Sequence, residues 1–231
     1  MRNTAYSILL AALVVSSFAS GATLQVGSDL QSAIDAASSG DTLVVAAGIY
    51  SKIVVDKSLN LIGRGAVIRA GGRDAWMSIN ADAVNISGFL VENGFYGIKL
   101  EQVRGCKVSN NTVIHCAQPG IALLYSDANI ITGNNASFNG IVGEGWYGIY
   151  LSNSNHNLIA DNEAIGNGAY GINLFPSCNN NTITGNRLQG NMYGLYMFRD
   201  CGSNLIRNNE LSKNINSGLD LRFNCTGNLI E

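Results

Sequence analysis

The chain has 231 residues, of which 46% are hydrophobic, 13% are charged and 27 are glycine. About a quarter of the residues are charged in ordinary soluble domains, so this chain is poor in charge. Its net charge of −2 gives no electrostatic reason to expect a nucleic acid or an anionic membrane as partner.

Residues 1–22 are typical of a signal peptide. Arg2 supplies a positive start, residues 8–15 form an apolar core too short to span a bilayer, and small residues at 20–22 offer a cleavage site. A buried N-terminal helix or strand is the alternative. We expect the mature chain, residues 23–231, to be secreted or held at the cell surface or in a periplasm-like space. No later segment is long and apolar enough to predict a transmembrane anchor.

Residues 23–82 are predicted to form an N-terminal cap followed by irregular coils. Ser28 and Gln31 fit a capping box at the start of a helix, and Gly40 is expected to end it. The apolar face of this helix consists of Leu30, Ala33, Ile34 and Ala37. Such a helix would cover the open end of the first coil and hide its strand edges.

Residues 83–231 carry a regular repeat. Glycine followed by an aliphatic residue recurs at steps of 23, 28, 23, 23 and 24 residues, at Gly97-Ile98, Gly120-Ile121, Gly148-Ile149, Gly171-Ile172, Gly194-Leu195 and Gly218-Leu219. A fixed period of about two dozen residues is typical of a solenoid, whose repeats bury their apolar faces by stacking. Each repeat has three short apolar stretches separated by Asn and Gly, which predicts three strands per coil.

The predicted fold is therefore an all-β parallel β-helix with three sheets and coils of about 23 residues. A leucine-rich repeat has a similar period, but its leucine columns are sparse here and Asn recurs three times per coil. We consider that fold the weaker alternative.

Asparagine occupies fixed positions in the repeat. A structural ladder is predicted at Asn111, Asn134, Asn162, Asn186 and Asn209. A second is expected at Asn93, Asn139, Asn167, Asn191 and Asn214, with Cys116 replacing Asn in one coil, and a third at Asn129, Asn157, Asn181, Asn204 and Asn228. Stacked buried amides can pass hydrogen bonds from coil to coil. The residues before the first ladder tolerate the left-handed backbone of a sharp turn, namely Asn110, Gly133, Asp161, Gly185 and Asn208.

The stretches 40–50 (GDTLVVAAGIY) and 57–63 (KSLNLIG) resemble the opening of secreted β-helix proteins of the NosD-like group, a part of the wider set of carbohydrate-binding and sugar-hydrolase repeats. The Gly-Ile-x-Leu and Ile-x-x-Asn repeats match the same group. The resemblance covers about residue 24 to the end and implies that the predicted fold is a right-handed parallel β-helix. Similar proteins include alginate epimerases, polysaccharide lyases, surface proteins without known activity, and a periplasmic factor that helps load copper into nitrous oxide reductase.

Strand alternation predicts an outward surface rich in aromatic residues on the sheet that contains the Gly-Ile motif. The candidate ligand-binding residues are Tyr150, Asn173, Phe175, Tyr196 and Phe198, together with Trp146 in a five-residue insertion. Flat rings along a sheet suit stacking against sugar rings. The alternative is that the tyrosines preceding each Gly pack on themselves at a coil corner, and that the insertion is a plain loop.

No catalytic residue can be assigned from the sequence, and Glu144 in the insertion is the one weak candidate. The charges of the outward columns, Lys99 and Glu101 at one end and Asp220 and Arg222 at the other, should lie ~24 Å apart, which favours binding over cleavage. Glu163, Arg187 and Glu210 are expected to form an ion-pair ladder outside another sheet.

No cofactor is predicted. Copper needs grouped His, Met or Cys, whereas His115 and Cys116 have no further ligand near them in the repeat register and His156 stands alone at a turn. Calcium is not expected either.

Cys178, Cys201 and Cys225 fall in one column, continuing Ser126 and Ser154 of earlier coils. Stacked Cα atoms ~4.8 Å apart are within reach of a disulfide, so either Cys178–Cys201 or Cys201–Cys225 can form. Small buried thiols that simply continue a serine column are the alternative.

The last coil has no cap, and we expect its exposed strand edges to permit self-association. The functional hypothesis is an exported, non-catalytic module that binds a polysaccharide or another cell-envelope component. The alternatives are a polysaccharide lyase or epimerase, and a NosD-type accessory protein for copper maturation.

Overall fold

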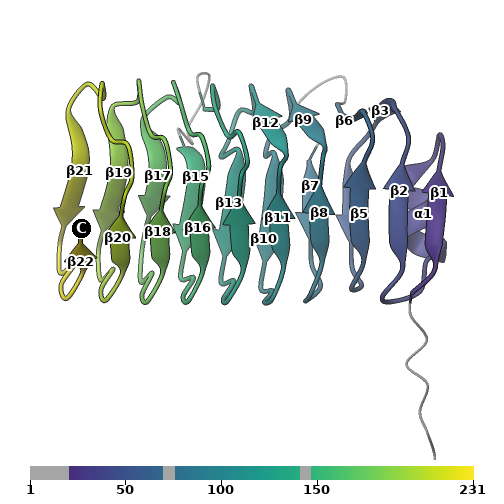
Figure 1. Ribbon diagram of the computed structural model, residues 1–231, viewed down its shortest axis with the longest axis horizontal. Helices are drawn as coiled ribbons and strands as arrows, with labels where there is room; N and C mark the ends of the chain where they lie inside the picture. Colours follow the sequence, from purple (N-terminus) through teal and green to yellow (C-terminus); the bar gives the residue numbers. More distant parts are fainter. Residues whose placement is uncertain (1–20, 70–75, 141–146) are drawn as a thin grey trace, which may run out of the picture.

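The computed structural model describes residues 21–69, 76–140 and 147–231 of the chain (Figure 1). These residues form a parallel β-solenoid of about 9 coils in which strands that follow one another along the axis are hydrogen-bonded neighbours. The predicted three-sheet parallel β-helix is confirmed.

The longest sheet runs the whole length of the described chain. It has ten strands in the order β1 (Thr23–Val26), β2 (Thr42–Val45), β5 (Asn60–Gly63), β8 (Asn85–Ser87), β11 (Lys107–Ser109), β14 (Ile130–Thr132), β16 (Leu158–Ala160), β18 (Thr182–Thr184), β20 (Leu205–Arg207) and β22 (Leu229–Ile230). Three of these strands, β1, β2 and β5, lie in residues 23–82, which the sequence predicted as a cap and irregular coils.

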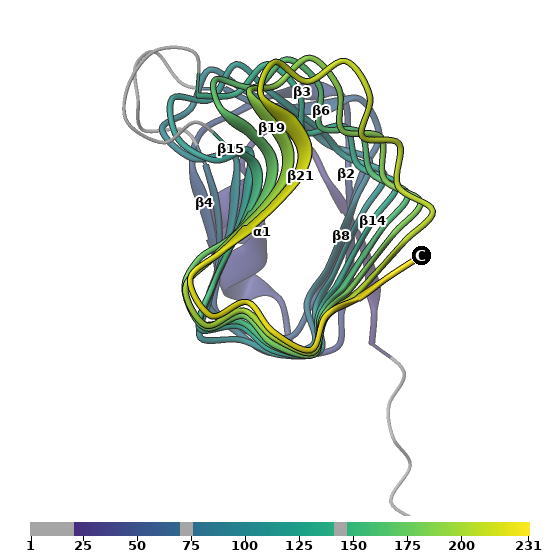
Figure 2. The ribbon, with the colours of Figure 1, turned by 90° about the vertical axis from the view of Figure 1, so that its left-hand side faces the viewer.

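The second sheet contains the Gly-Ile motif and has eight strands among the described residues. They are β4 (Ile53–Val55), β7 (Met77–Ile79), β10 (Ile98–Glu101), β13 (Ile121–Leu124), β15 (Tyr147–Ser152), β17 (Tyr170–Leu174), β19 (Tyr193–Phe198) and β21 (Ser217–Arg222). Seen along the axis, this sheet lies opposite the ten-stranded sheet (Figure 2).

The third sheet is short. Its four strands, β3 (Gly48–Tyr50), β6 (Ala66–Ile68), β9 (Leu90–Glu92) and β12 (Thr112–Ile114), close the remaining side of the coil. Beyond β12 the same side continues as single parallel bridges that link residues 112, 135, 163, 187 and 210 in turn.

Inward side chains stack into aliphatic columns because equivalent residues of successive coils are paired in register. Ile98, Ile121, Ile149, Ile172 and Leu195 form one such column, and all of them are fully buried. No single coil could bury this surface by itself, so the core exists only through stacking. Strands in neighbouring coils lie ~4.8 Å apart, which fixes the spacing of every column.

The predicted asparagine ladders are present in the interior. In the first, the Oδ1 of Asn162 accepts from the backbone N–H of Asn134 at 3.0 Å and from its Nδ2 at 3.0 Å. The Nδ2 of Asn162 in turn donates to Oδ1 of Asn186 at 3.0 Å and to the carbonyl of Ile131 at 2.9 Å. The amides therefore satisfy backbone groups that the turns would otherwise leave unpaired.

The residues before the first ladder have a left-handed backbone, as predicted. Their φ angles are 54° for Asn110, 64° for Gly133, 54° for Asp161, 67° for Gly185 and 53° for Asn208.

The second ladder needs one correction. Asn93, expected as a member, has a φ of 58° and shares the left-handed position with His115. Gly94 takes the place in register with Cys116, because the N–H of Ala117 bonds to the Gly94 carbonyl as that of Gly140 bonds to Cys116. The sequence placed Asn93 one residue out of register because its residue type matched the ladder.

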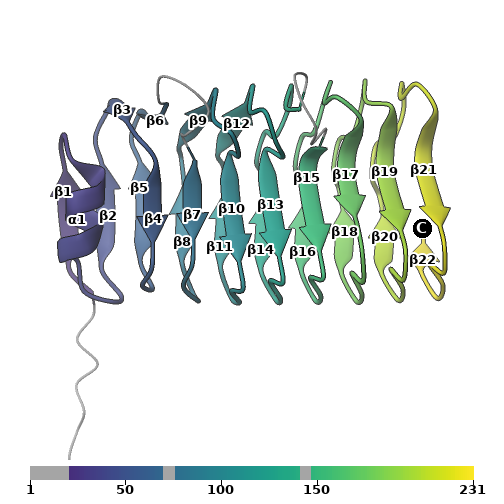
Figure 3. The same cartoon turned by 180° about the vertical axis from the view of Figure 1, so that it is seen from behind.

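The N-terminal helix, α1 (Leu30–Ala36), is present and closes the first coils (Figure 3). Its residues Leu30 and Ile34 are buried. Its N-cap is Asp29, whose carboxylate accepts from the N–H of Ser32 at 3.0 Å, so the predicted capping box at Ser28 is wrong. The helix ends at Ala36, before Gly40, because extended backbone at Ala37 already breaks it.

In the last coil, Leu229 and Ile230 are about half exposed. Self-association through this coil remains a prediction. Within the described residues, no helix is long and apolar enough to cross a membrane.

Candidate functional site

Three tyrosines stack in one column along the second sheet. The rings of Tyr147 and Tyr170 have centroids 5.3 Å apart, and those of Tyr170 and Tyr193 are 5.5 Å apart, each pair tilted by 16°. The parallel pairing of β15, β17 and β19 sets this register. The tyrosines preceding Gly therefore do pack on one another, as the structural alternative supposed.

The next outward column contributes Tyr150, Asn173 and Tyr196. The ring of Tyr150 stacks on Tyr147 at 4.9 Å, and that of Tyr196 lies 4.8 Å from Tyr170. The two columns thus form one layer of rings on the outside of the sheet. Tyr196 is buried to 9% exposure by its neighbours, while Tyr147, Tyr150 and Tyr170 remain half-buried and present one ring face or edge to solvent.

A third aromatic group continues the layer toward the last coil. Phe198 contacts Phe175 at 5.3 Å and Phe223 at 4.7 Å, the latter edge to face, and its ring is parallel to that of Tyr196 within 16°. Phe223 is 67% exposed. We call the complete set the aromatic face; it comprises Tyr147, Tyr150, Tyr170, Phe175, Tyr193, Tyr196, Phe198 and Phe223.

Asn173 is the polar residue at the centre of the aromatic face. It stands in register between Tyr150 and Tyr196 and is only 4% exposed. Its Oδ1 atom is buried and has no hydrogen-bond partner. An unpaired buried carbonyl is costly, on the order of 1–3 kcal/mol, so Asn173 is a polar residue that the aromatic face holds at a cost in stability.

The tyrosine hydroxyls of the face stay protonated. Burial raises the pKa of Tyr147, Tyr150 and Tyr170 above its ordinary value. These groups therefore remain neutral hydrogen-bond donors and acceptors at and well above pH 7. The Tyr150 hydroxyl donates to the Phe175 carbonyl at 2.9 Å, which fixes the orientation of its ring.

A smaller aromatic cluster lies on the same sheet near its N-terminal end. Trp76, Phe95 and Tyr96 are within 6.3 Å of one another by ring centroid. The Lys52 ammonium lies 4.0 Å above the Trp76 ring, so this ring is already covered by a cation.

The structure brings five of the predicted binding residues together: Tyr150, Asn173, Phe175, Tyr196 and Phe198. Trp146 and Glu144 lie outside the described residues. Their assignments as binding residue and catalytic candidate remain predictions.

Sequence analysis missed Phe223 and the neighbouring Arg199. Both occupy a turn that is one residue longer in the last three coils. Six positions separate Ile172 from Cys178, whereas five separate Ile149 from Ser154. This difference in spacing is the sequence feature that indicates an additional residue in the turn.

At each end of the outward columns, the acidic and the basic side chain form an ion pair with each other. Lys99 binds Glu101 at 2.6 Å and Arg222 binds Asp220 at 2.8 Å, in both cases between residues two apart on one strand. The register places Ala122, Tyr150, Asn173 and Tyr196 between Lys99 and Asp220.

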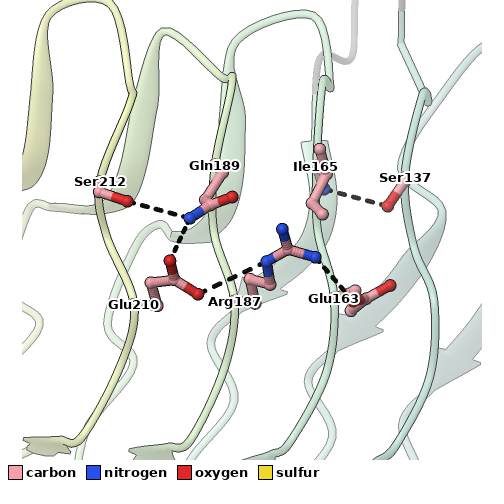
Figure 4. Close-up of polar contacts among 7 residues, drawn as sticks. All are labelled: Ser137, Glu163, Ile165, Arg187, Gln189, Glu210 and Ser212. Carbon is pink, nitrogen blue, oxygen red and sulfur yellow. Dashed lines mark hydrogen bonds and ion pairs between the residues drawn. The ribbon is translucent and has the colours of Figure 1, made fainter.

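The predicted ion-pair ladder on the third side is confirmed (Figure 4). Arg187 binds Glu163 at 3.2 Å and Glu210 at 3.5 Å. Gln189 extends this network by donating to Glu210 and, at 2.9 Å, to Ser212. All three charged side chains of the ladder are about half exposed, so the ladder contributes little to stability.

All five cysteines are described, and all are free thiols. Cys178 and Cys201 are fully buried. The Cys178 thiol donates to the Pro176 carbonyl at 3.3 Å, and its interaction with the neighbouring Cys201 thiol, together with burial, raises the pKa of Cys178. A disulfide in this column remains a prediction.

The disulfide can be checked on protein secreted under oxidising conditions. We expect non-reducing peptide mapping to recover a Cys178–Cys201 or Cys201–Cys225 bridge, because adjacent coils hold these Cα atoms at bridging distance. Cys116, whose pKa burial raises to about 12, serves as the internal control for an unreactive thiol. Alkylation of all three column cysteines after denaturation would exclude the bridge.

The profile of the family described as periplasmic copper-binding protein (NosD) matches residues 34–223. The chain therefore belongs to the NosD family of β-helix proteins. A cell surface glycoprotein from Methanothermus fervidus is 39% identical over 89 residues, which cover 36% of this chain and 15% of that relative. The chain thus corresponds to a small part of the length of this relative.

Solved structures show the same fold at low sequence identity. An alginate lyase from a Paenibacillus species has a TM-score of 0.67 at 18% identity, with 80% of this chain and 75% of that chain covered. The periplasmic alginate epimerase AlgG has a TM-score of 0.66 at 16% identity, with 90% and 55% covered. At such identities the likeness establishes the β-helix and nothing finer.

The described residues do not fit copper, which the family description implies. Nowhere in residues 21–69, 76–140 and 147–231 do three His, Cys, Asp or Glu side chains come together in a way that could hold a metal ion. His115 and His156 are exposed at separate turns, and Met77 and Met197 are buried in the core. Copper sites need such soft or borderline donors in one cluster.

Proposed function

We propose that the protein is an extracytoplasmic β-helix module that binds glycan through the aromatic face. The observation that carries this proposal is the layer of half-exposed rings from three consecutive coils around the unpaired Oδ1 of Asn173. The apolar faces of sugar rings stack on flat aromatic surfaces, and the neutral tyrosine hydroxyls of the face can exchange hydrogen bonds with sugar hydroxyls.

The arrangement of charge favours binding over cleavage. Hydrolysis and elimination of a glycan both require convergent acid and base groups. On this face the acids Glu101 and Asp220 are each paired with a cation, and they stand five coils apart, ~24 Å at the strand spacing. The coils between them offer rings and amides in the same columns.

The family description and the matched surface protein support a location outside the cytoplasm. A rigid solenoid suits such a role, because strand register fixes the positions of Tyr150, Tyr196 and Phe198. Signal cleavage after residue 22 belongs to the same proposal.

Phe198→Ala is expected to weaken glycan binding at least tenfold. This ring joins Tyr196 to Phe223 in the middle of the exposed surface, and truncation of a central aromatic residue typically costs about 1.4 kcal/mol or more. A glycan array on the wild type identifies the strongest oligosaccharide, and titration calorimetry with that oligosaccharide compares the variants.

Phe138→Ala is the matched control. Phe138 is also an exposed aromatic residue, at 46%, but it lies on a different turn beside His115. Its removal should leave the affinity unchanged. Absence of binding to every glycan on the array, or equal losses in the two variants, would contradict the proposal.

A further inference from the structure

The last three coils have an extra residue in the turn that follows the aromatic strand. Ser126, Ser154, Cys178 and Cys201 are equivalent, because each gives its carbonyl to a ladder Asn of the next coil. Between the strand and this position, coils with Cys have one residue more than coils with Ser. The additional positions are Pro176, Arg199 and Phe223.

The longer turn brings a cation to the edge of the aromatic face. The Arg199 guanidinium lies 5.7 Å from the centroids of both Phe175 and Phe198. The backbone of Arg199 is left-handed, with φ at 62°, and the residue is exposed. This conformation directs its side chain over the phenylalanine rings.

Arg199 also has no ion-pair partner within the described residues, whereas the neighbouring Arg222 is paired. Arg222 is bound by both carboxylate oxygens of Asp220, at 2.8 to 3.1 Å. The Asp200 carboxylate accepts from Nδ2 of Asn224 at 2.7 Å. Within the described residues, no carboxylate pairs with Arg199 in the way that Glu163 and Glu210 pair with Arg187.

We infer that the glycan bound by the aromatic face is acidic, and that Arg199 binds its anionic group. This inference rests on the glycan-binding function proposed above. A sugar ring stacked on the exposed Phe223 lies next to Phe198, over which the guanidinium stands, so a substituent of that sugar faces Arg199. A planar guanidinium can donate two parallel hydrogen bonds to a carboxylate or sulfate, which adds geometric selectivity to the charge attraction.

The neutral sugar and the anionic group then have separate binding elements. The aromatic rings bind the body of the sugar, and Arg199 binds the anionic group. A neutral sugar should consequently still bind, with lower affinity, and the difference between acidic and neutral forms should disappear when Arg199 is removed.

The test uses two pairs of polymers on the full mature chain. Oligogalacturonate is compared with its fully methyl-esterified form, and dextran sulfate is compared with dextran, by biolayer interferometry at low and moderate salt. We expect the wild type to bind an acidic polymer at least tenfold more tightly than its neutral counterpart. The carboxylate and sulfate pairs distinguish which anionic group is preferred.

Arg199→Gln and Arg187→Gln form the matched pair of variants. Both remove one positive charge, but Arg187 belongs to the ion-pair ladder on another side of the coil. Arg199→Gln should reduce the preference for the acidic polymer to less than twofold, while Arg187→Gln should keep it. Arg199→Lys should retain part of the preference, because it keeps the charge but loses the two-pronged geometry.

The outcomes separate the inference from the glycan-binding function itself. Equal binding of acidic and neutral polymers by the wild type would overturn the inference and leave glycan binding intact. Equal losses in the two glutamine variants would also overturn it, since the effect would then reflect net charge alone. Binding of none of the four polymers would count against both. Thermal unfolding by circular dichroism verifies that each variant is folded.

Discussion

Replacing Asn162 by alanine is expected to lower the free energy of unfolding by about 3–5 kcal/mol. The Asn162 side chain makes four hydrogen bonds in the interior, to Asn134, Asn186 and the Ile131 carbonyl. Its loss leaves the buried backbone N–H of Asn134 without an acceptor, and each such orphaned group costs about 1–3 kcal/mol. Urea unfolding followed by far-ultraviolet circular dichroism measures the effect.

Asn85→Ala is the control for this prediction. Asn85 is exposed on the outside of β8, and its Nδ2 bonds to Oδ1 of Asn60, which is a solvated contact. We expect a change within about 0.5 kcal/mol. Similar urea midpoints for Asn162→Ala and Asn85→Ala would show that the interior ladder has no special role in stability.

Gly148→Ala is expected to cost about 3 kcal/mol, although it adds only a methyl group. A Cβ atom at Gly148 would lie 2.7 Å from the Gly171 carbonyl oxygen, 2.7 Å from Nδ2 of Asn167 and 2.8 Å from the Ala136 carbonyl oxygen. Two of these atoms belong to the backbone and the third to a ladder amide, so none can move without breaking hydrogen bonds of the coil.

Gly27→Ala provides the comparison, because a Cβ atom there would meet no other atom within 4 Å. The free energy of unfolding of the Gly27→Ala variant should stay unchanged or rise by up to about 1 kcal/mol, since alanine reduces the conformational freedom of the unfolded chain. Thermal denaturation of both variants checks the pair. Equal melting temperatures for the two proteins would contradict the close approach at Gly148.

This glycine column shows what the sequence could and could not reveal. The spacing of Gly-Ile pairs was enough to predict the coil length and the paired register of Ile149 with Ile172, which the structure confirms. The sequence alone did not show why glycine is required before the aliphatic residue. Only stacking reveals that the ladder amide of Asn167 and the carbonyl of the next coil occupy the space of a side chain at Gly148.

The candidate site was predictable where its residues lie on strands. Strand alternation gives the outward residues, so Tyr150, Asn173 and Tyr196 could be placed in one column from their spacing. Turns carry no such period. Arg199 and Phe223 stand at an extra position of the last coils, and their approach to Phe198 depends on a left-handed backbone that alternation does not encode.

The caps were predicted least well because helix ends depend on single side chains. Asp29 and Ser28 are both good N-cap residue types, and their order in the chain does not decide which one accepts the hydrogen bond. The structure assigns that role to Asp29.

The amide ladders also give the solenoid an axial polarity. In each ladder the Nδ2 atom points to the following coil and the Oδ1 atom toward the preceding one, as in the series Asn134, Asn162 and Asn186. Backbone bonds of parallel strands alternate in sense, whereas these side-chain dipoles all add along the axis, and aligned hydrogen bonds polarise one another. A coil inserted in the opposite orientation would set donor against donor on one side and acceptor against acceptor on the other, so coils can be added or exchanged by engineering only in the parental orientation.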